Sequence, residues 1–242
     1  MGVRVLAVSD QVHEGLAAGM TAGMTAGTAR GRIADLIVAC GDLPADYLAT
    51  LMNALDAPLV FIPGNHDPDL SGYRESRTGL FTLAGFPATP PWPEGALSAD
   101  GRVVDAAGLR IAGLGGCVRY AEGPNQYTER QQARRARRLR ACARRRRLRD
   151  HRSVDVLITH APPRGIGDAD DLPHRGFRCY HRLVADLAPA ALLHGHVHPG
   201  GTQPQARLAG RTRVCNVTGW RLLEVTPGLA LTELPGSPHH AS

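Results

Sequence analysis

Lysine is absent from this chain, and all 28 of its basic residues are arginine. Together with the abundance of alanine and glycine, this bias is typical of a GC-rich genome, so the number of arginines by itself says little about function. The five cysteines are odd in number and widely spaced, and no Cys-x-x-Cys pair occurs. Such cysteines are typical of reduced thiols in a cytoplasm, and they argue against a disulfide framework or a structural zinc knot.

Long apolar runs are also missing. No stretch approaches the roughly 20 residues that span a bilayer. Residues 1–9 lack the basic region, apolar core and cleavage site of a secretion signal. We therefore expect a cytoplasmic protein that has no membrane partner. No linker divides the 242 residues, so we predict a single domain over residues 1–235 and a disordered tail over residues 236–242.

The positive charge is concentrated in one segment. The formal net charge is +6, but residues 129–152 hold twelve arginines against two acids, a local balance of +10 that leaves −4 for the rest. A stripe of this kind can bind nucleic-acid phosphates, so the segment Arg130–Arg152 is a candidate site for that partner. The alternative is a solvated helix that lies on a sheet with its arginines outward, and the absence of interleaved aromatic residues favours this interpretation.

Strands and helices alternate along much of the chain. We predict buried strands at residues 3–8, 36–40, 59–62, 154–159 and 190–193, and helices at residues 44–55, 129–149 and 178–187. An antiparallel hairpin is expected around Ala107-Gly108, short strands at residues 213–217, 221–225 and 229–234, and loop at residues 67–98. This order predicts an α/β fold with mixed sheets.

Five of the predicted strands end on side chains that ligate metals. In chain order, the side chains that follow these strands are Asp10; Asp42; Asn65, His66 and Asp67; His160; and His194, His196 and His198. Ligands gather where strand ends converge in α/β sheets, and glycines 41, 64 and 195 permit a close approach of the backbone. Carboxylate, amide and imidazole donors suit divalent transition metals. Their number fits two metals that share a carboxylate, with a bridging hydroxide that attacks phosphorus.

The order D…GD…GNHD…H…GHVH resembles the calcineurin-like metallophosphoesterase superfamily, and the match extends from about Val3 to Val225. The resemblance implies a four-layer α/β/β/α sandwich of two mixed sheets, with two divalent ions (Mn, Fe, Zn, Co or Ni) at the strand ends. It implies that Asp42 bridges the metals, that Asp10 and His198 hold the first, and that Asn65, His160 and His196 hold the second. His66 is then the non-ligand histidine that contacts the phosphate and assists the leaving group. Asp67 is expected to orient its loop, and His194 to be a core or supporting histidine.

The resemblance implies a dimetal phosphoric ester hydrolase, a phosphomonoesterase or phosphodiesterase, that acts on a small phosphoester. Two alternatives stay open. One is a nuclease or nucleic-acid processing enzyme of the same fold, which the arginine segment supports. The other is a non-catalytic scaffold with a degenerate metal site. No feature of the sequence indicates the oligomeric state.

The chain departs from the family pattern at its first motif. The family has D-x-H there, whereas Val12 follows Asp10 at that spacing and the histidine comes one residue later, at His13. In an extended segment Asp10 and Val12 face one side and His13 the other. Either the loop bulges and brings His13 to the metals, or His13 is displaced from them, which is the interpretation we favour. Arg119 follows a glycine-rich strand end and is a candidate substrate-binding residue or, equally, a surface arginine.

Overall fold

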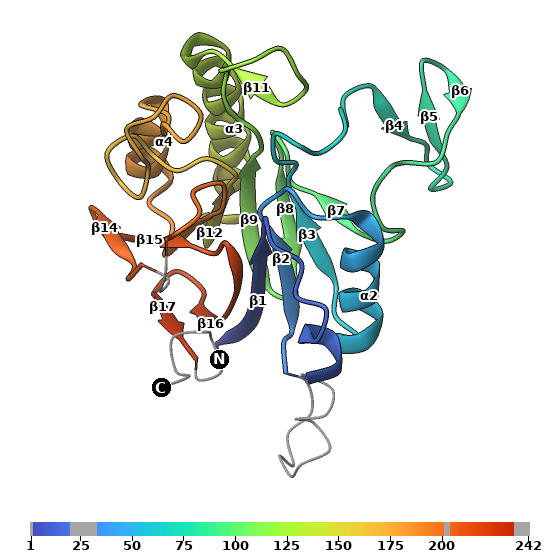
Figure 1. Ribbon diagram of the computed structural model, residues 1–242, viewed down its shortest axis with the longest axis horizontal. Helices are drawn as coiled ribbons and strands as arrows, with labels where there is room; N and C mark the ends of the chain where they lie inside the picture. Colours follow the sequence, from blue (N-terminus) through green and yellow to red (C-terminus); the bar gives the residue numbers. More distant parts are fainter. Residues whose placement is uncertain (1, 20–32, 201–203, 235–242) are drawn as a thin grey trace.

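The computed structural model describes residues 2–19, 33–200 and 204–234, and two six-stranded sheets form its centre (Figure 1). The predicted tail at residues 236–242 lies outside the described residues. The first sheet has the order β17 (Ala230–Glu233), β16 (Gly219–Thr226), β1 (Val3–Ser9), β2 (Leu36–Ala39), β3 (Leu59–Phe61) and β7 (Leu97–Ser98). The second has the order β14 (Arg207–Ala209), β15 (Thr212–Asn216), β13 (Ala191–His194), β12 (Val156–Thr159), β9 (Leu109–Leu114) and β8 (Val103–Ala106).

Both sheets are mixed. In the first, β1, β2, β3 and β7 are parallel, while β16 and β17 pair antiparallel. In the second, β9, β12, β13 and β15 are parallel, and β8 and β14 add antiparallel edges. The parallel strands of each sheet therefore end at one edge, where the side chains that follow them can meet.

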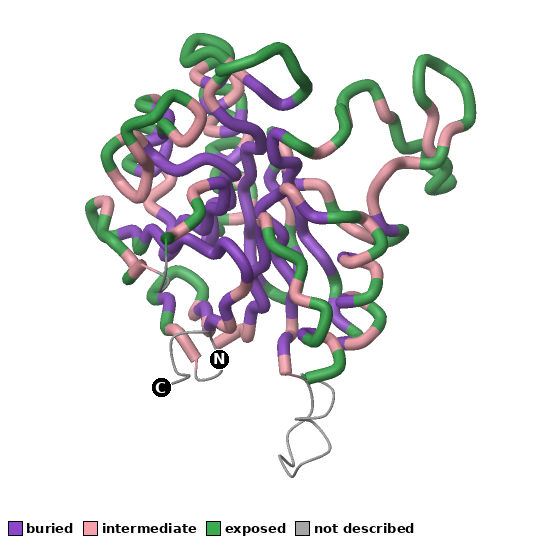
Figure 2. Tube along the Cα trace, viewed as in Figure 1, coloured by how far each residue is buried: buried purple, intermediate pink, exposed green. Residues whose placement is uncertain are grey.

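Side-chain alternation along the strands builds four layers. Val5 and Ala7 of β1 belong to the core between the sheets, which also holds Ile111 of β9. Leu6 and Val8 face the other way and pack with α2 (Ala45–Leu55). Helices α3 (Glu129–Asp150) and α4 (Cys179–Leu187) cover the outer face of the second sheet. Figure 2 shows the buried trace running through the sheets, so the predicted α/β/β/α sandwich is confirmed.

Most predicted elements appear within a few residues of their expected bounds. The hairpin between β8 and β9 turns through Ala107 and Gly108, whose φ angles are +48° and +84°. Residues 67–98 are not only loop. They contain β7 and a three-stranded antiparallel sheet of β4 (Tyr73–Glu75), β5 (Phe81–Leu83) and β6 (Phe86–Pro87), which extends from the body (Figure 1). β10 (Cys117–Val118) and β11 (Gln126–Tyr127) form a further parallel pair. Of the described helices, none is long and apolar enough to cross a membrane.

Helix α3 lies on the second sheet, and none of its arginines is among its buried side chains. Its buried side chains are Gln132, Ala136, Leu139 and Ala143. At the margins of this face, Arg135, Arg140 and Arg146 form ion pairs with Asp100, Asp186 and Asp105. The N-terminus begins with a capping box between Thr128 and Gln131, which satisfies two backbone donors. The helix thus has the outward arginine face that the sequence predicts.

Candidate metal centre

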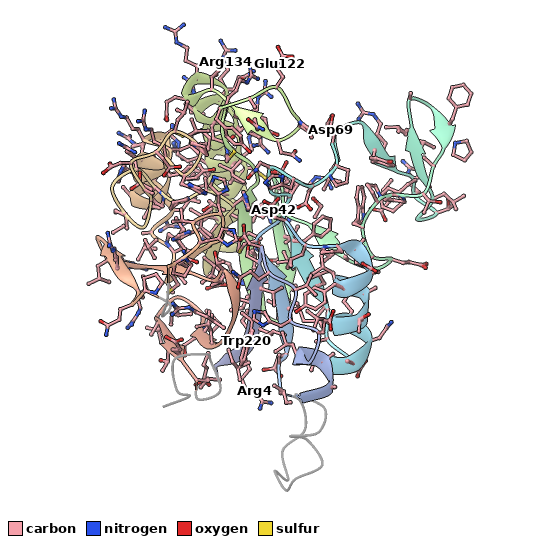
Figure 3. All side chains as sticks on the ribbon, in the orientation of Figure 1. Arg4, Asp42, Asp69, Glu122, Arg134 and Trp220 are labelled. Carbon is pink, nitrogen blue, oxygen red and sulfur yellow. The ribbon has the colours of Figure 1, made fainter. Side chains whose placement is uncertain are left out.

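The predicted ligands follow adjacent strand ends from both sheets. Asp10 follows β1 and Asp42 follows β2, while His196 comes after β13 in the facing sheet. All three residues have φ between +58° and +68°, which residues other than glycine seldom adopt. Such strained backbone is found where the surrounding structure holds side chains at a functional position. In Figure 3 the label of Asp42 lies near the middle of the molecule, above the strands of the first sheet.

Asp42, His160 and His196 form the centre of the site. One ligand atom from each lies within 4.8 Å of the others. His160 is fully buried, and its Nε2 lies 3.3 Å from Asp42 Oδ2 and 2.9 Å from Asn65 Oδ1. The rings of His160 and His196 are 4.8 Å apart between centroids. Four of the predicted metal ligands therefore converge on one small volume.

The hydrogen bonds of His160 orient it as a ligand. Its Nδ1–H donates to the backbone oxygen of Cys40 at 2.7 Å, which directs Nε2 at Asp42 and Asn65. Burial lowers the pKa of His160, but the hydrogen bond to Asp42 and the charges of Asp10 and Asp42 raise it to about 9. The second proton thus lies on Nε2, between oxygens. A divalent cation fits the position of that proton, because it would meet the same oxygens and the imidazole lone pair.

Asp42 and His196, beside His160, have the charge states that metal ligands require. Burial raises the pKa of Asp42, but hydrogen bonding and the charge of His160 outweigh it, and the pKa falls below its ordinary value. Burial lowers the pKa of His196 to about 3, so its imidazole is neutral. Its Nε2–H donates to Pro173 O at 2.7 Å, which leaves Nδ1 as the lone-pair donor. A charged carboxylate and a neutral imidazole are the forms that bind metals.

Asp10 and His198 lie together beside this centre. His198 Nε2 is 3.8 Å from Asp10 Oδ1, and Asp10 Oδ2 accepts the backbone N–H of His196 at 2.9 Å. The Asp10 side chain is buried, whereas that of His198 is half exposed. The two residues assigned to the first metal are therefore adjacent, and their binding of that metal stays a prediction.

Glycines make room for the carboxylates. A Cβ on Gly64 would lie 2.0 Å from Asp42 Oδ1, and one on Gly195 would lie 2.2 Å from Asp10 Oδ2. Asp67 Oδ2 accepts the backbone N–H groups of Gly64 and Asp42 at 2.7 and 2.8 Å, so it holds the loop as expected. The ligand oxygens thus occupy space that a side chain at either glycine would fill.

Comparison with known proteins agrees with this geometry. The family model of calcineurin-like phosphoesterases matches residues 4–200. The chain belongs to this family. The structure of TT1561 of Thermus thermophilus aligns over 92% of this chain and 94% of its own, with 16% identity and a TM-score of 0.56. GAP50, the anchor in the inner membrane complex of Plasmodium, aligns over 96% and 88%, with 9% identity and a TM-score of 0.51. Both share the fold of this family member, and no curated protein matches it significantly.

The structure places His13, the residue at which the chain departs from the family motif, away from the three central ligands. The backbone N–H of His13 contacts the hydroxyl of Tyr47 in α2 at 3.4 Å. The residue lines a cavity with Trp220 and Leu222 of β16, and it is not part of the group formed by the three central ligands. Figure 3 shows Trp220 well below Asp42. This placement agrees with a displaced His13, whose effect on metal binding stays a prediction.

Arg119 and its neighbour Tyr120 face different partners. The Arg119 guanidinium donates to the backbone oxygen of Gln126 in β11 and to Gln131 Oε1 at the start of α3. A phosphate contact of Arg119 therefore stays a prediction. The hydroxyl of Tyr120 accepts from Asn65 Nδ2 at 3.2 Å, which turns the Asn65 Oδ1 toward His160. Tyr120 is thus the residue of this pair that contacts a predicted ligand.

Sequence reasoning missed a histidine in the loop after β12. The His174 ring lies 5.3 Å from that of His196, and its Nδ1 is 2.6 Å from Asp171 Oδ2. A carboxylate that accepts from one ring nitrogen orients the other nitrogen. The Asp-x-x-His spacing is a weak signal in a Pro-rich loop, so only the packing of this loop against the segment after β13 identifies the pair.

Proposed function

We propose that the chain is a metal-dependent phosphoesterase that hydrolyses a phosphate mono- or diester. The observation that carries this proposal is the convergence of Asp42, Asn65, His160 and His196 on one volume. In this proposal two divalent ions would be held by Asp42 together with Asp10 and His198 for the first and with Asn65, His160 and His196 for the second. Such ions supply Lewis-acid activation of water and of phosphoryl oxygens.

The protein's own groups hold the reacting partners. His66 is exposed, its backbone N–H donates to Asp42 Oδ1 at 2.8 Å, and it lines a cavity together with Asp42. A protonated imidazole at this position can give its proton to the departing alkoxide, a step that contributes roughly 10²–10⁴-fold in rate. The backbone oxygen of Cys40 orients the fully buried His160, and Tyr120 fixes the Asn65 amide. Asp171 and His174 support His196 from the facing loop.

The test is hydrolysis of nitrophenyl phosphate and bis(nitrophenyl) phosphate with manganese. Asp42→Asn is expected to abolish turnover, because the amide removes the carboxylate charge that would hold the metals, and His66→Ala to lower it by about 10²-fold or more. Glu75→Gln, in the exposed β4, is the matched control and should keep wild-type rates. Wild-type turnover of Asp42→Asn would refute the mechanism.

A second candidate, a nucleic-acid processing enzyme of the same fold, is favoured by one observation. A groove of about 650 Å³ runs between α3 and α4, and its lining includes Arg134 and Arg137 of α3 and Arg182 of α4. This enzyme differs in requiring a polymer substrate, so a phosphoester panel that includes nucleotides and oligonucleotides separates the two.

The scaffold alternative is favoured by Val12, which replaces a family ligand. Metal analysis discriminates, because a degenerate site would hold negligible manganese after reconstitution. A phosphoesterase would retain close to two ions per chain.

A further inference from the structure

A cavity of about 450 Å³ opens beside the metal centre, and Asp42 and His66 form part of its lining. Its volume lies in the range of small-molecule sites, roughly 300–1,000 Å³. Because these two residues belong to the proposed catalytic site, whatever occupies the cavity is held next to the phosphate. The cavity is therefore placed to receive the organic part of a substrate.

The remaining walls of the cavity are mostly apolar. They come from the start of α2, from the end of β3 and from the segments that flank the small sheet, and include Leu43, Leu48, Phe61, Leu70 and Trp92. Trp92 is the largest of these side chains, and three rings hold it in place. Phe61, Tyr73 and Phe81 lie 5.2 to 5.9 Å from it between centroids, the last two edge-on. Tilted and edge-on ring pairs are favourable geometries, so these contacts help to hold Trp92 in the wall.

The charge of the lining selects against polar substrates. Among the described residues that line the cavity there is no arginine, and the ionisable ones are Asp42, His66 and Asp67. A second phosphate or a carboxylate would find no guanidinium there with which to pair. Hydroxyl groups of a sugar would lose water against leucine, proline and tryptophan side chains, and buried polar groups without partners are costly.

We propose that this cavity binds an uncharged apolar group, alkyl or aryl, of the phosphoester, with the phosphate at the Asp42–His66 end. The inference rests on the proposed function, because it assigns the substrate class of that same site. It predicts poor activity on sugar phosphates and on nucleoside di- and triphosphates. It also explains why the small sheet of β4, β5 and β6 is attached to this edge of the fold, since that sheet supplies two of the rings that hold Trp92.

The experiment measures binding and turnover with matched probes. The chain has two tryptophans, so a Trp220→Phe background makes Trp92 the fluorescent reporter. Octylphosphonate, phenylphosphonate and methylphosphonate are titrated into the manganese-loaded protein. Each buried methylene is worth about fourfold in affinity, so the octyl probe is expected to bind at least tenfold more tightly than the methyl probe and to change Trp92 emission. Comparison of phenylphosphonate with octylphosphonate distinguishes a preference for aryl groups from a preference for alkyl groups.

Three variants localise the effect. Ala45→Gln places a neutral side chain from the first turn of α2 into the cavity, and glutamine is a good helix former, so the fold is retained. It should remove the octyl advantage and leave methylphosphonate binding unchanged. Trp92→Ala, which removes the fluorescent reporter, should abolish the preference in kcat/KM for octyl over methyl phosphate. Leu208→Ser, at an exposed position of β14, is the control and should keep the advantage.

The outcomes separate this inference from the proposed function. Equal affinity for the octyl, phenyl and methyl probes, or an octyl advantage that survives in Ala45→Gln, would overturn the cavity assignment. Hydrolysis of methyl and octyl phosphate at equal kcat/KM would overturn it too, while leaving the phosphoesterase in place. An octyl advantage that Ala45→Gln removes and Leu208→Ser keeps, with no ester hydrolysed, would support the cavity and overturn the phosphoesterase.

Discussion

Replacing Gly64 by alanine is expected to disable the metal centre through a single methyl group. Gly64 does not have a positive φ, so alanine can adopt its backbone conformation without strain. The obstacle is space, because the new Cβ would lie 2.0 Å from Asp42 Oδ1 and 2.7 Å from His160 Cε1. Gly64→Ala is therefore a steric probe of the position of Asp42, and it leaves every predicted ligand chemically intact.

The magnitude follows from these distances. Cβ contacts under 3.0 Å essentially never occur, so Asp42 Oδ1 must move by at least about 1 Å. That oxygen accepts the backbone N–H of His66 at 2.8 Å, a bond that the movement would disturb. A misplacement of about 1 Å costs on the order of 10²-fold in rate, and overpacking of a filled site costs about 1–3 kcal/mol in the free energy of unfolding. We expect a loss of this size in turnover and a lower metal content.

The assay combines manganese content after dialysis, nitrophenyl ester hydrolysis and thermal unfolding. Gly15→Ala is the matched control, since a Cβ at Gly15 meets no atom within 4 Å among the described residues. It should leave all three measurements at wild-type values. If Gly64→Ala retains wild-type manganese content and turnover, the carboxylate of Asp42 is not held against this glycine as a ligand, and the reasoning fails.

Four further predictions concern other parts of the molecule. His13→Ala should leave metal content unchanged by mass spectrometry, and a loss of one ion would show that His13 is a ligand. Removal of metal by a chelator should lower Tm by about 5–10 °C for each ion that is present at about 100 times its Kd, and an unchanged Tm would contradict tight binding. Arg110→Met should lower the free energy of unfolding in urea by about 3 kcal/mol, because Arg110 is buried and forms ion pairs with two aspartates. Arg145 is exposed, so Arg145→Met should change this free energy by no more than about 0.5 kcal/mol. Arg137→Glu should weaken filter retention of duplex DNA more than Arg138→Glu, because Arg137 lines the groove between α3 and α4 and Arg138 does not. If wild-type protein retains no DNA at low salt, the proposal of a nucleic-acid partner is refuted.

Much of the fold follows from local patterns. Apolar runs such as residues 3–8 and 154–159 become buried strands because both faces of each central strand are covered. The helix at residues 129–150 has a capping box and a narrow apolar face, both of which are visible in the sequence. Local patterns do not predict the three-stranded sheet within residues 67–98, since its strands are only two or three residues long and mostly exposed.

By itself, the sequence determined which side chains end the strands, and with the family motif it pointed to Asp42, Asn65, His160 and His196. The sequence predicts these ligands because the type of side chain that follows a strand and the spacing of the neighbouring glycines are local properties of the chain. Only the tertiary structure decided which groups support these ligands. Cys40 O orients His160, Tyr120 turns Asn65, and Pro173 O holds His196. In the first two of these pairs, the partners are separated by 55 or more positions in the sequence. Such contacts depend on the registers of two facing sheets and on how loops pack over their ends, and neither is encoded within one segment. The same holds for the apolar cavity, whose walls come from segments that meet only when the first sheet is assembled.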